Sequence, residues 1–116
     1  MHRWLQKVAV KFLGFLICIA ASAADQPFAL ILKKRCLPCH NEELKNGGLS
    51  FVDRDSVLRG GGRGPAIVPG KPEASLMIAT LSHTGDLQMP PGPPLPAKEV
   101  RILKEWIKGG APWGAR

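Results

Sequence analysis

The pentapeptide CLPCH at residues 36–40 is the feature that most limits what this chain can fold into. A Cys-x-x-Cys pair serves three chemistries: zinc binding, thiol–disulfide exchange and, when histidine follows directly, covalent attachment of haem. Zinc in a closed site needs about four ligands, and disulfide exchange of the thioredoxin kind needs a βαβ frame. The rest of the sequence therefore has to decide between them.

The first 24 residues have the layout of a secretory signal peptide. An apolar run, FLGFLICIAA, is preceded by Arg3, Lys7 and Lys11 and followed by the small residues ASAA. The run is too short for a comfortable transmembrane helix, and an uncleaved membrane anchor is the alternative interpretation. We expect a signal peptide over residues 1–24 and one domain over residues 25–116. That domain would be exported to the bacterial periplasm and would stay at the membrane only if the signal is uncleaved.

Export changes both the charge and the cysteine count of the mature chain. The full sequence has 16 basic and 9 acidic side chains, and three of the basic ones lie in residues 1–23, so the mature net charge is 13 − 9 = +4. That excess is modest and no nucleic-acid motif accompanies it, so we expect no nucleic-acid partner. Cys18 leaves with the signal, and the mature domain keeps only Cys36 and Cys39.

The mature sequence predicts short helices joined by long loops rich in glycine and proline. The helical patterns are PFALILKK from Pro27, DRDSVLRGGG at 53–62, KPEASLMIATL at 71–81 and PAKEVRILKEWIKGG at 96–110. No convincing strand pattern occurs. Long loops in a small domain need something to wrap around, and a large flat ligand would supply that surface. The expected fold class is all-α, with three to five short helices.

Covalent haem fits this context better than the other two chemistries. Zinc would have only Cys36, Cys39 and at most His83 as ligands, and the segment before the motif reads as helix rather than strand. Two cysteines at this spacing reach the two vinyl groups along one porphyrin edge, and the next residue then lies beneath the iron. We therefore expect one covalently bound haem c, tethered by Cys36 and Cys39, with His40 as the proximal iron ligand.

The sixth iron ligand has three candidates in the sequence. Met89 lies 49 residues after His40 (89 − 40), in a proline-rich loop where Pro90 and Pro91 stiffen the backbone. Met77 falls in an apolar helical stripe and is expected to pack in the core. We expect Met89 to be the distal ligand, with His83 as the alternative, and an iron without a sixth protein ligand stays open.

These segments together resemble the cytochrome c family, and most closely the planctomycete-type cytochrome c domain. The resemblance is carried by CLPCH, GGLSF with the following Asp53, GGGRGPAIVPGKPEASLM, QMPP and KEWIKGGAPW. It implies a small class I cytochrome c-like fold wrapped around haem c, bound through Cys36, Cys39 and His40 with Met89 opposite. It also implies that the Phe28 helix packs across the Trp106 helix near the haem.

The function expected from this resemblance is that of an exported electron carrier. It would transfer single electrons by Fe(III)/Fe(II) cycling and would not be an enzyme. A peroxidase-like haem enzyme, with His83 as its distal acid–base group, is one alternative. A haem-stabilised redox or sensor module of a larger assembly is the other.

Four further expectations concern partners and the haem surroundings. The partners would be redox proteins, although neither donor nor acceptor can be named from the sequence. The basic triplet Lys33–Arg35 would steer an acidic partner, or would be an ordinary solvated helix face. Arg63 would meet a haem propionate or stay in solvent, and Ile67 and Val68 would line the haem pocket.

Overall fold

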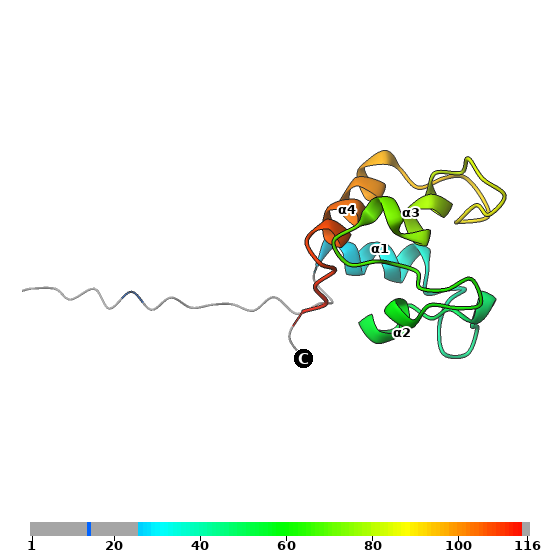
Figure 1. The fold of residues 1–116 in the computed structure, drawn as a ribbon, viewed down its shortest axis with the longest axis horizontal. Helices are drawn as coiled ribbons and strands as arrows, with labels where there is room; N and C mark the ends of the chain where they lie inside the picture. Colours follow the sequence, from blue (N-terminus) through cyan, green and yellow to red (C-terminus); the bar gives the residue numbers. More distant parts are fainter. Residues whose placement is uncertain (1–13, 15–25, 115–116) are drawn as a thin grey trace, which may run out of the picture.

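The computed structural model describes Gly14 and residues 26–114, and this part of the chain is helical. Its helices are α1 Pro27–Arg35, α2 Arg54–Arg59, α3 Leu76–Leu81 and α4 Ala97–Lys108, with the 3-10 turns η2 Asn46–Gly48 and η3 Pro72–Ala74 (Figure 1). No β-strand forms among these residues, where two isolated bridges are the only strand-like pairings. The predicted all-α class is confirmed. The predicted signal peptide lies outside the described residues apart from Gly14, and the boundary at residue 25 stays a prediction.

Helices α1 and α4 cross through a cluster of three aromatic rings. The Phe28 ring stacks on Trp106 with centroids 4.5 Å apart and planes 6° from parallel, and Trp113 meets Phe28 edge-on at 5.6 Å. The Trp106 Nε1–H donates to the Pro112 carbonyl oxygen at 2.8 Å, so the indole is satisfied while buried. The packing of α1 across α4 agrees with the expectation drawn from the family resemblance.

The apolar stripe predicted for α4 faces the core of the domain. Leu103 and Ile107 are fully buried and Trp106 nearly so, while Val100 and Ile102 pack at the edge of the core. Glu99 in the first turn forms a two-bonded ion pair with Arg35 at the end of α1, with Nε–Oε2 at 3.0 Å. The two helices are therefore joined at one end by charge and along their length by apolar packing.

Helix α2 lies apart from the other three helices and is tied to them through loops (Figure 1). Asp53 caps its start by accepting the Ser56 backbone N–H at 2.8 Å, and Gly60 ends it in a left-handed conformation with φ of 71°. The Arg54 guanidinium donates to the carbonyl oxygens of Gly110 and Ala111 at 3.1 and 3.0 Å. This contact fixes α2 to the segment that follows α4.

The helix predicted over residues 71–81 is wrong in extent, because it divides at Ser75. Residues 72–74 form the 3-10 turn η3, and α3 begins only at Leu76. The Ser75 hydroxyl accepts the Val68 N–H at 2.9 Å and donates to the Lys71 carbonyl oxygen at 2.9 Å. A serine side chain that bonds to nearby backbone competes with helical hydrogen bonds, and here it holds Ser75 extended.

Candidate functional site

A cavity of about 330 Å³ lies between the CLPCH segment and the segments α3 and 87–95. Its lining is mostly apolar, and its size falls within the range of small-molecule sites, roughly 300–1,000 Å³. Five separate segments supply the lining, which brings together all four predicted site residues: Cys36, Cys39, His40 and Met89. Residues far apart in the sequence therefore meet around one partly open cavity.

The two cysteines lie in a single tight turn at the end of α1. Cys36 is the C-cap residue of that helix, and its carbonyl oxygen accepts the backbone N–H groups of Cys39 at 3.2 Å and His40 at 2.9 Å. Both thiols are free, with Cys36 half-buried and Cys39 exposed. The turn thus places two thiols on one edge of the cavity, as attachment to two vinyl groups of one ring requires.

The chemistry of Cys36 is unlike that of a disulfide-exchanging cysteine. Burial, followed by the effect of the Cys39 thiol, raises the pKa of Cys36 to about 12. Reactive Cys-x-x-Cys thiols have a lowered pKa, because the thiolate is the attacking species. The raised pKa of Cys36 therefore disfavours a thioredoxin-like role. Within the described residues, no group of three or more His, Cys, Asp or Glu side chains could hold a metal ion.

The His40 ring is oriented by a backbone carbonyl. Its Nδ1 lies 2.9 Å from the Asn46 carbonyl oxygen, and its ring meets Phe51 edge-on with centroids 5.7 Å apart. A carbonyl oxygen only accepts, so Nδ1 must carry the proton and the neutral ring keeps its lone pair on Nε2. An imidazole held in this way is prepared to bind a metal ion through Nε2.

Two glycine-rich segments make the wall behind His40. The Gly62 N–H donates to the Gly47 carbonyl oxygen at 2.8 Å, which joins η2 to the loop after α2. A Cβ atom on Gly61 would collide with that same carbonyl oxygen. The two backbones can come into direct contact because glycine has no side chain to separate them.

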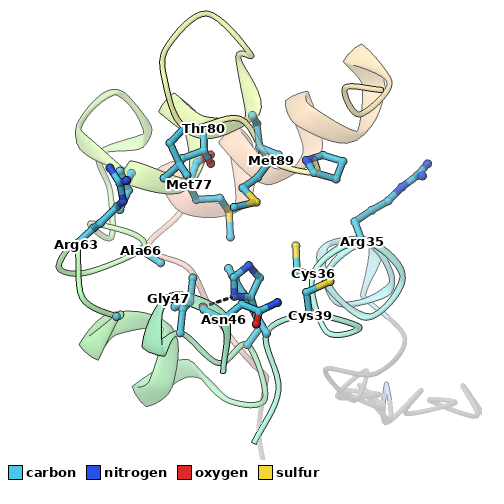
Figure 2. Close-up of a pocket in the computed structure, with 18 of the residues that line it drawn as sticks. Arg35, Cys36, Cys39, Asn46, Gly47, Arg63, Ala66, Met77, Thr80 and Met89 are labelled. Atoms are coloured by element: carbon cyan, nitrogen blue, oxygen red, sulfur yellow. Dashed lines mark hydrogen bonds between the residues drawn. The ribbon is translucent and has the colours of Figure 1, made fainter. Parts of the chain in front are cut away.

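Two methionines face the cysteines across the cavity. Figure 2 shows the side chains of Met77, from α3, and Met89, from the following loop, reaching into the cavity from the wall opposite Cys36 and Cys39. Met77 is buried as expected for a core residue, with 6% of its surface exposed, yet it also lines the cavity. The structure therefore presents two thioethers on the side where one was expected.

His83 is not among the residues that line the cavity. Its ring Nε2 lies 2.9 Å from the Met89 carbonyl oxygen, and its backbone is left-handed with φ of 55°. His83, the alternative ligand, thus contacts the backbone of Met89, the preferred ligand. This position does not favour His83 as a ligand or as a distal acid–base group.

The other expectations about the lining have mixed outcomes. Ile67 and Val68 do not line the cavity, because Ile67 points into the core, where it is 1% exposed, and their neighbour Ala66 supplies the lining instead. Arg63 does line it. None of the three rings of the α1–α4 cluster is a lining residue, so this cluster supports the fold without forming part of the cavity wall.

The basic triplet divides into two parts. Arg35 lines the cavity and is held by Glu99, whereas Lys33 and Lys34 are exposed on α1. Only the two lysines are therefore free to approach a partner, and a docking role for them stays a prediction.

Several contacts of the site carry no clear signal in the sequence. The Asn46 contact uses a backbone carbonyl, which any residue would supply. Phe51, Leu81 and Leu95 are lining residues whose apolar character is that of any core position. Their place at the cavity follows from tertiary packing.

The site fits a covalently attached haem. Two thiols and an oriented imidazole stand on one side, two thioethers stand on the other, and apolar side chains lie between them. Soft thioether and imidazole groups are the usual axial ligands of electron-transferring haem iron.

Comparisons with known proteins agree with this geometry. A family profile described as planctomycete cytochrome C matches residues 36–93, which are half of the 116-residue chain. The chain is also 27% identical over 97 residues to the cytochrome c-551 of Allochromatium vinosum, a match that covers 84% of this chain and 99% of that protein. No solved structure gives a significant match.

Proposed function

The chain belongs to the planctomycete cytochrome c family, and from that premise we propose that it carries single electrons outside the cytoplasm with His40 and Met89 as the axial iron ligands. Membership implies covalently bound haem c and a small cytochrome c-like fold. The observation that carries the proposal is the cavity itself, in which two thiols and an oriented imidazole face two thioethers. When bound, the haem supplies an iron that gains and loses one electron.

The protein's own residues have distinct tasks in this proposal. Cys36 and Cys39 would hold the haem as thioethers, and the bond from Nδ1 to the Asn46 carbonyl oxygen keeps the His40 ring oriented and its Nε2 basic. The apolar lining would keep water away from a bound haem, so that little solvent would have to rearrange when its charge changes. A soft thioether opposite His40 favours the reduced iron and raises the reduction potential.

Met89 is the preferred distal ligand, and Met77 is the second candidate. Met77 sits in α3, where its backbone N–H donates to the Ala66 carbonyl oxygen at 2.8 Å and fixes its position beside the core. Met89 lies on the loop after α3, and its side chain reaches into the cavity from the wall opposite Cys36 and Cys39. We assign the ligand role to Met89 and a water-excluding role to Met77.

We assign an electron-carrier role rather than an enzymatic one. In the described part of the chain, the cavity wall opposite His40 offers thioethers, alkyl groups and the Thr80 hydroxyl, which already donates to the Met77 carbonyl oxygen at 2.7 Å. A peroxidase-like reaction needs an acid–base group poised over an open iron site. Such a group is missing from the described lining of that wall.

Export is proposed from the sequence of residues 1–24 and from the family, since attachment of haem c takes place outside the cytoplasm. The described residues contain no helix that is both long and apolar enough to cross a bilayer. We propose the periplasm as the location, with redox proteins as the partners.

Two measurements test this proposal. Acid extraction of the purified, exported protein should leave the haem on the chain, and the intact mass should include it; haem that is lost in acid contradicts the tethering by Cys36 and Cys39.

Met89→Ala should lower the reduction potential by at least about 60 mV, a tenfold change in the one-electron equilibrium, and should open the iron to small ligands. Met77→Leu is the matched control, because it keeps the volume but removes the sulfur. If Met77→Leu produces the larger fall, Met77 is the ligand.

A further inference from the structure

We propose that His83 is a positioning residue for the distal ligand: its Nε2–H bond to the Met89 carbonyl oxygen holds the Met89 thioether over the cavity. This inference rests on the ligand role proposed for Met89. It gives the described histidine outside the CLPCH motif a task in the redox site without contact to the iron.

The backbone of Met89 is held from both sides by residues at the end of α3. Its N–H donates to the Thr80 carbonyl oxygen at 3.1 Å, and its carbonyl oxygen lies 2.9 Å from the His83 ring nitrogen. Thr80 belongs to the last turn of α3, and His83 follows the helix by two residues. The ligand loop is thus pinned to a helix whose Leu81 is buried in the core.

The backbone at His83 is adapted to this contact. Its φ of 55° lies in the left-handed region, which is unfavourable by about 1 kcal/mol or more for a residue with a Cβ atom. Among such residues, asparagine, aspartate and histidine tolerate the conformation best. Of these three residues, only histidine also has a side-chain donor long enough to reach the Met89 carbonyl oxygen.

A second contact keeps the loop between the two residues closed. The Gln88 side-chain amide donates to the carbonyl oxygens of His83 at 3.2 Å and Gly85 at 3.4 Å. Residues 83 and 89 are therefore held as neighbours across a short loop. Because both the neutral Nε2–H form and the imidazolium donate at Nε2, the bond does not depend on which form is present.

The expected consequence follows from the weakness of the Fe–thioether bond. A neutral sulfur ligand competes poorly with external ligands unless its loop is already in place, since ordering the loop would otherwise reduce the net binding free energy. Removal of one hydrogen bond of about 1 kcal/mol should weaken that competition about fivefold.

His83→Asn is the variant that isolates this contact. Asparagine tolerates the left-handed backbone but is too short to reach the Met89 carbonyl. Titration of the ferric holoprotein with imidazole should show an apparent affinity about fivefold higher than in the wild type. The absorption band typical of methionine bound to ferric haem should weaken in parallel. His83→Gln, which restores a longer amide donor, should recover part of both signals.

Ser82→Ala is the matched control, since Ser82 lies in the same turn but bonds to the Ala79 carbonyl oxygen and to Thr84. It should leave imidazole affinity unchanged. If His83→Asn lowers thermal stability while imidazole affinity and the band stay at wild-type values, His83 is merely structural and the proposal is overturned. If Met89→Ala also leaves both signals unchanged, the ligand assignment for Met89 has failed instead.

Discussion

The two walls of the cavity are built in different ways. The wall that carries His40 is mostly local in sequence: one turn supplies Cys36, Cys39 and His40, and the Asn46 carbonyl, six residues after His40, orients the ring. The segment with Gly61 and Gly62 packs behind it. The wall that carries Met89 is made by a loop that returns to α3 and is held there through two backbone contacts. One wall is therefore mostly local in sequence and held by many hydrogen bonds, whereas the other depends on a loop that is held to the end of α3.

This contrast suggests that one wall governs folding and that the other governs the reduction potential of the bound haem. A densely bonded wall that also holds the proposed tethers Cys36 and Cys39 should govern whether the haem is attached and whether the small core is completed. A loop held by few contacts should instead govern how firmly the sixth ligand is bound, and hence the reduction potential. The Met89 and His83 variants described above should change redox properties with the fold retained, whereas changes in the His40 wall should affect stability first.

The largest effect is expected from the motif itself. Cys36→Ser and His40→Ala should each give little folded holoprotein, because a mature chain of about 90 residues has a marginal core without the group that fills its cavity. Limited proteolysis and the haem content of the exported protein measure this. A stable, protease-resistant and haem-free variant would contradict the claim that the His40 wall governs folding.

The next effect concerns the glycine contact behind His40. Gly61→Ala should lower the free energy of unfolding by about 3 kcal/mol, since its Cβ atom would collide with the Gly47 carbonyl oxygen. Gly62→Ala is the control, because a Cβ there would lie 3.7 Å from the same oxygen, an ordinary contact. Chemical denaturation of both holoproteins measures the difference. Equal stabilities would show that the backbone at Gly61 can shift at little cost, which would contradict the prediction.

A smaller loss is expected at Asn41, which organises the loop between His40 and Asn46. Its side chain donates to the Leu37 carbonyl oxygen at 2.7 Å and accepts the backbone N–H groups of Glu43 and Leu44 at 2.9 and 2.7 Å. Asn41→Ala should lower the free energy of unfolding by about 2 kcal/mol.

Glu43→Ala provides the control for Asn41, because the exposed Glu43 side chain can be removed while its backbone N–H remains. Denaturation curves of the two variants would sharpen the comparison of the walls. A change in reduction potential without any loss of stability in Asn41→Ala would contradict the assignment of this loop to folding.

The smallest effect is expected at the ion pair between α1 and α4. Glu99→Gln should lower the free energy of unfolding by about 0.5–1 kcal/mol, because the pair is two-bonded but remains partly open to solvent. Added salt should shrink the difference. Glu42→Gln, which removes the solvent-exposed pair with Lys45, should produce no measurable change in the same denaturation experiment.

Much of the site could be predicted from sequence because its proximal half is local. The spacing of Cys36, Cys39 and His40 means that any tight turn brings them to one edge, whatever the remainder of the fold does. The helices α1, α2 and α4 likewise follow from local periodicity and capping, such as the Asp53 cap. The division at Ser75 was missed, since its cause is a hydroxyl that bonds to residues four and seven positions away.

The distal half could be predicted only in part. Sequence position favoured Met89, but it could not show that Met77 would reach the same cavity from α3 or that His83 would turn to the Met89 backbone. It also placed Ile67 and Val68 in the lining, where packing put Ala66 instead. The positions of these side chains depend on how α3 and the following loop pack against the core.

The sequence by itself determined the local features of this protein: the turn with Cys36, Cys39 and His40 and the all-α character both follow from contacts between near neighbours in the chain. The tertiary structure alone decided which side chains face that chemistry from the other side, because Met77 and Met89 come from segments that lie far along the chain from His40, Met89 by 49 positions (89 − 40). Contacts between such distant segments are specified by the packing of the whole core, in which each side chain's direction depends on all its neighbours.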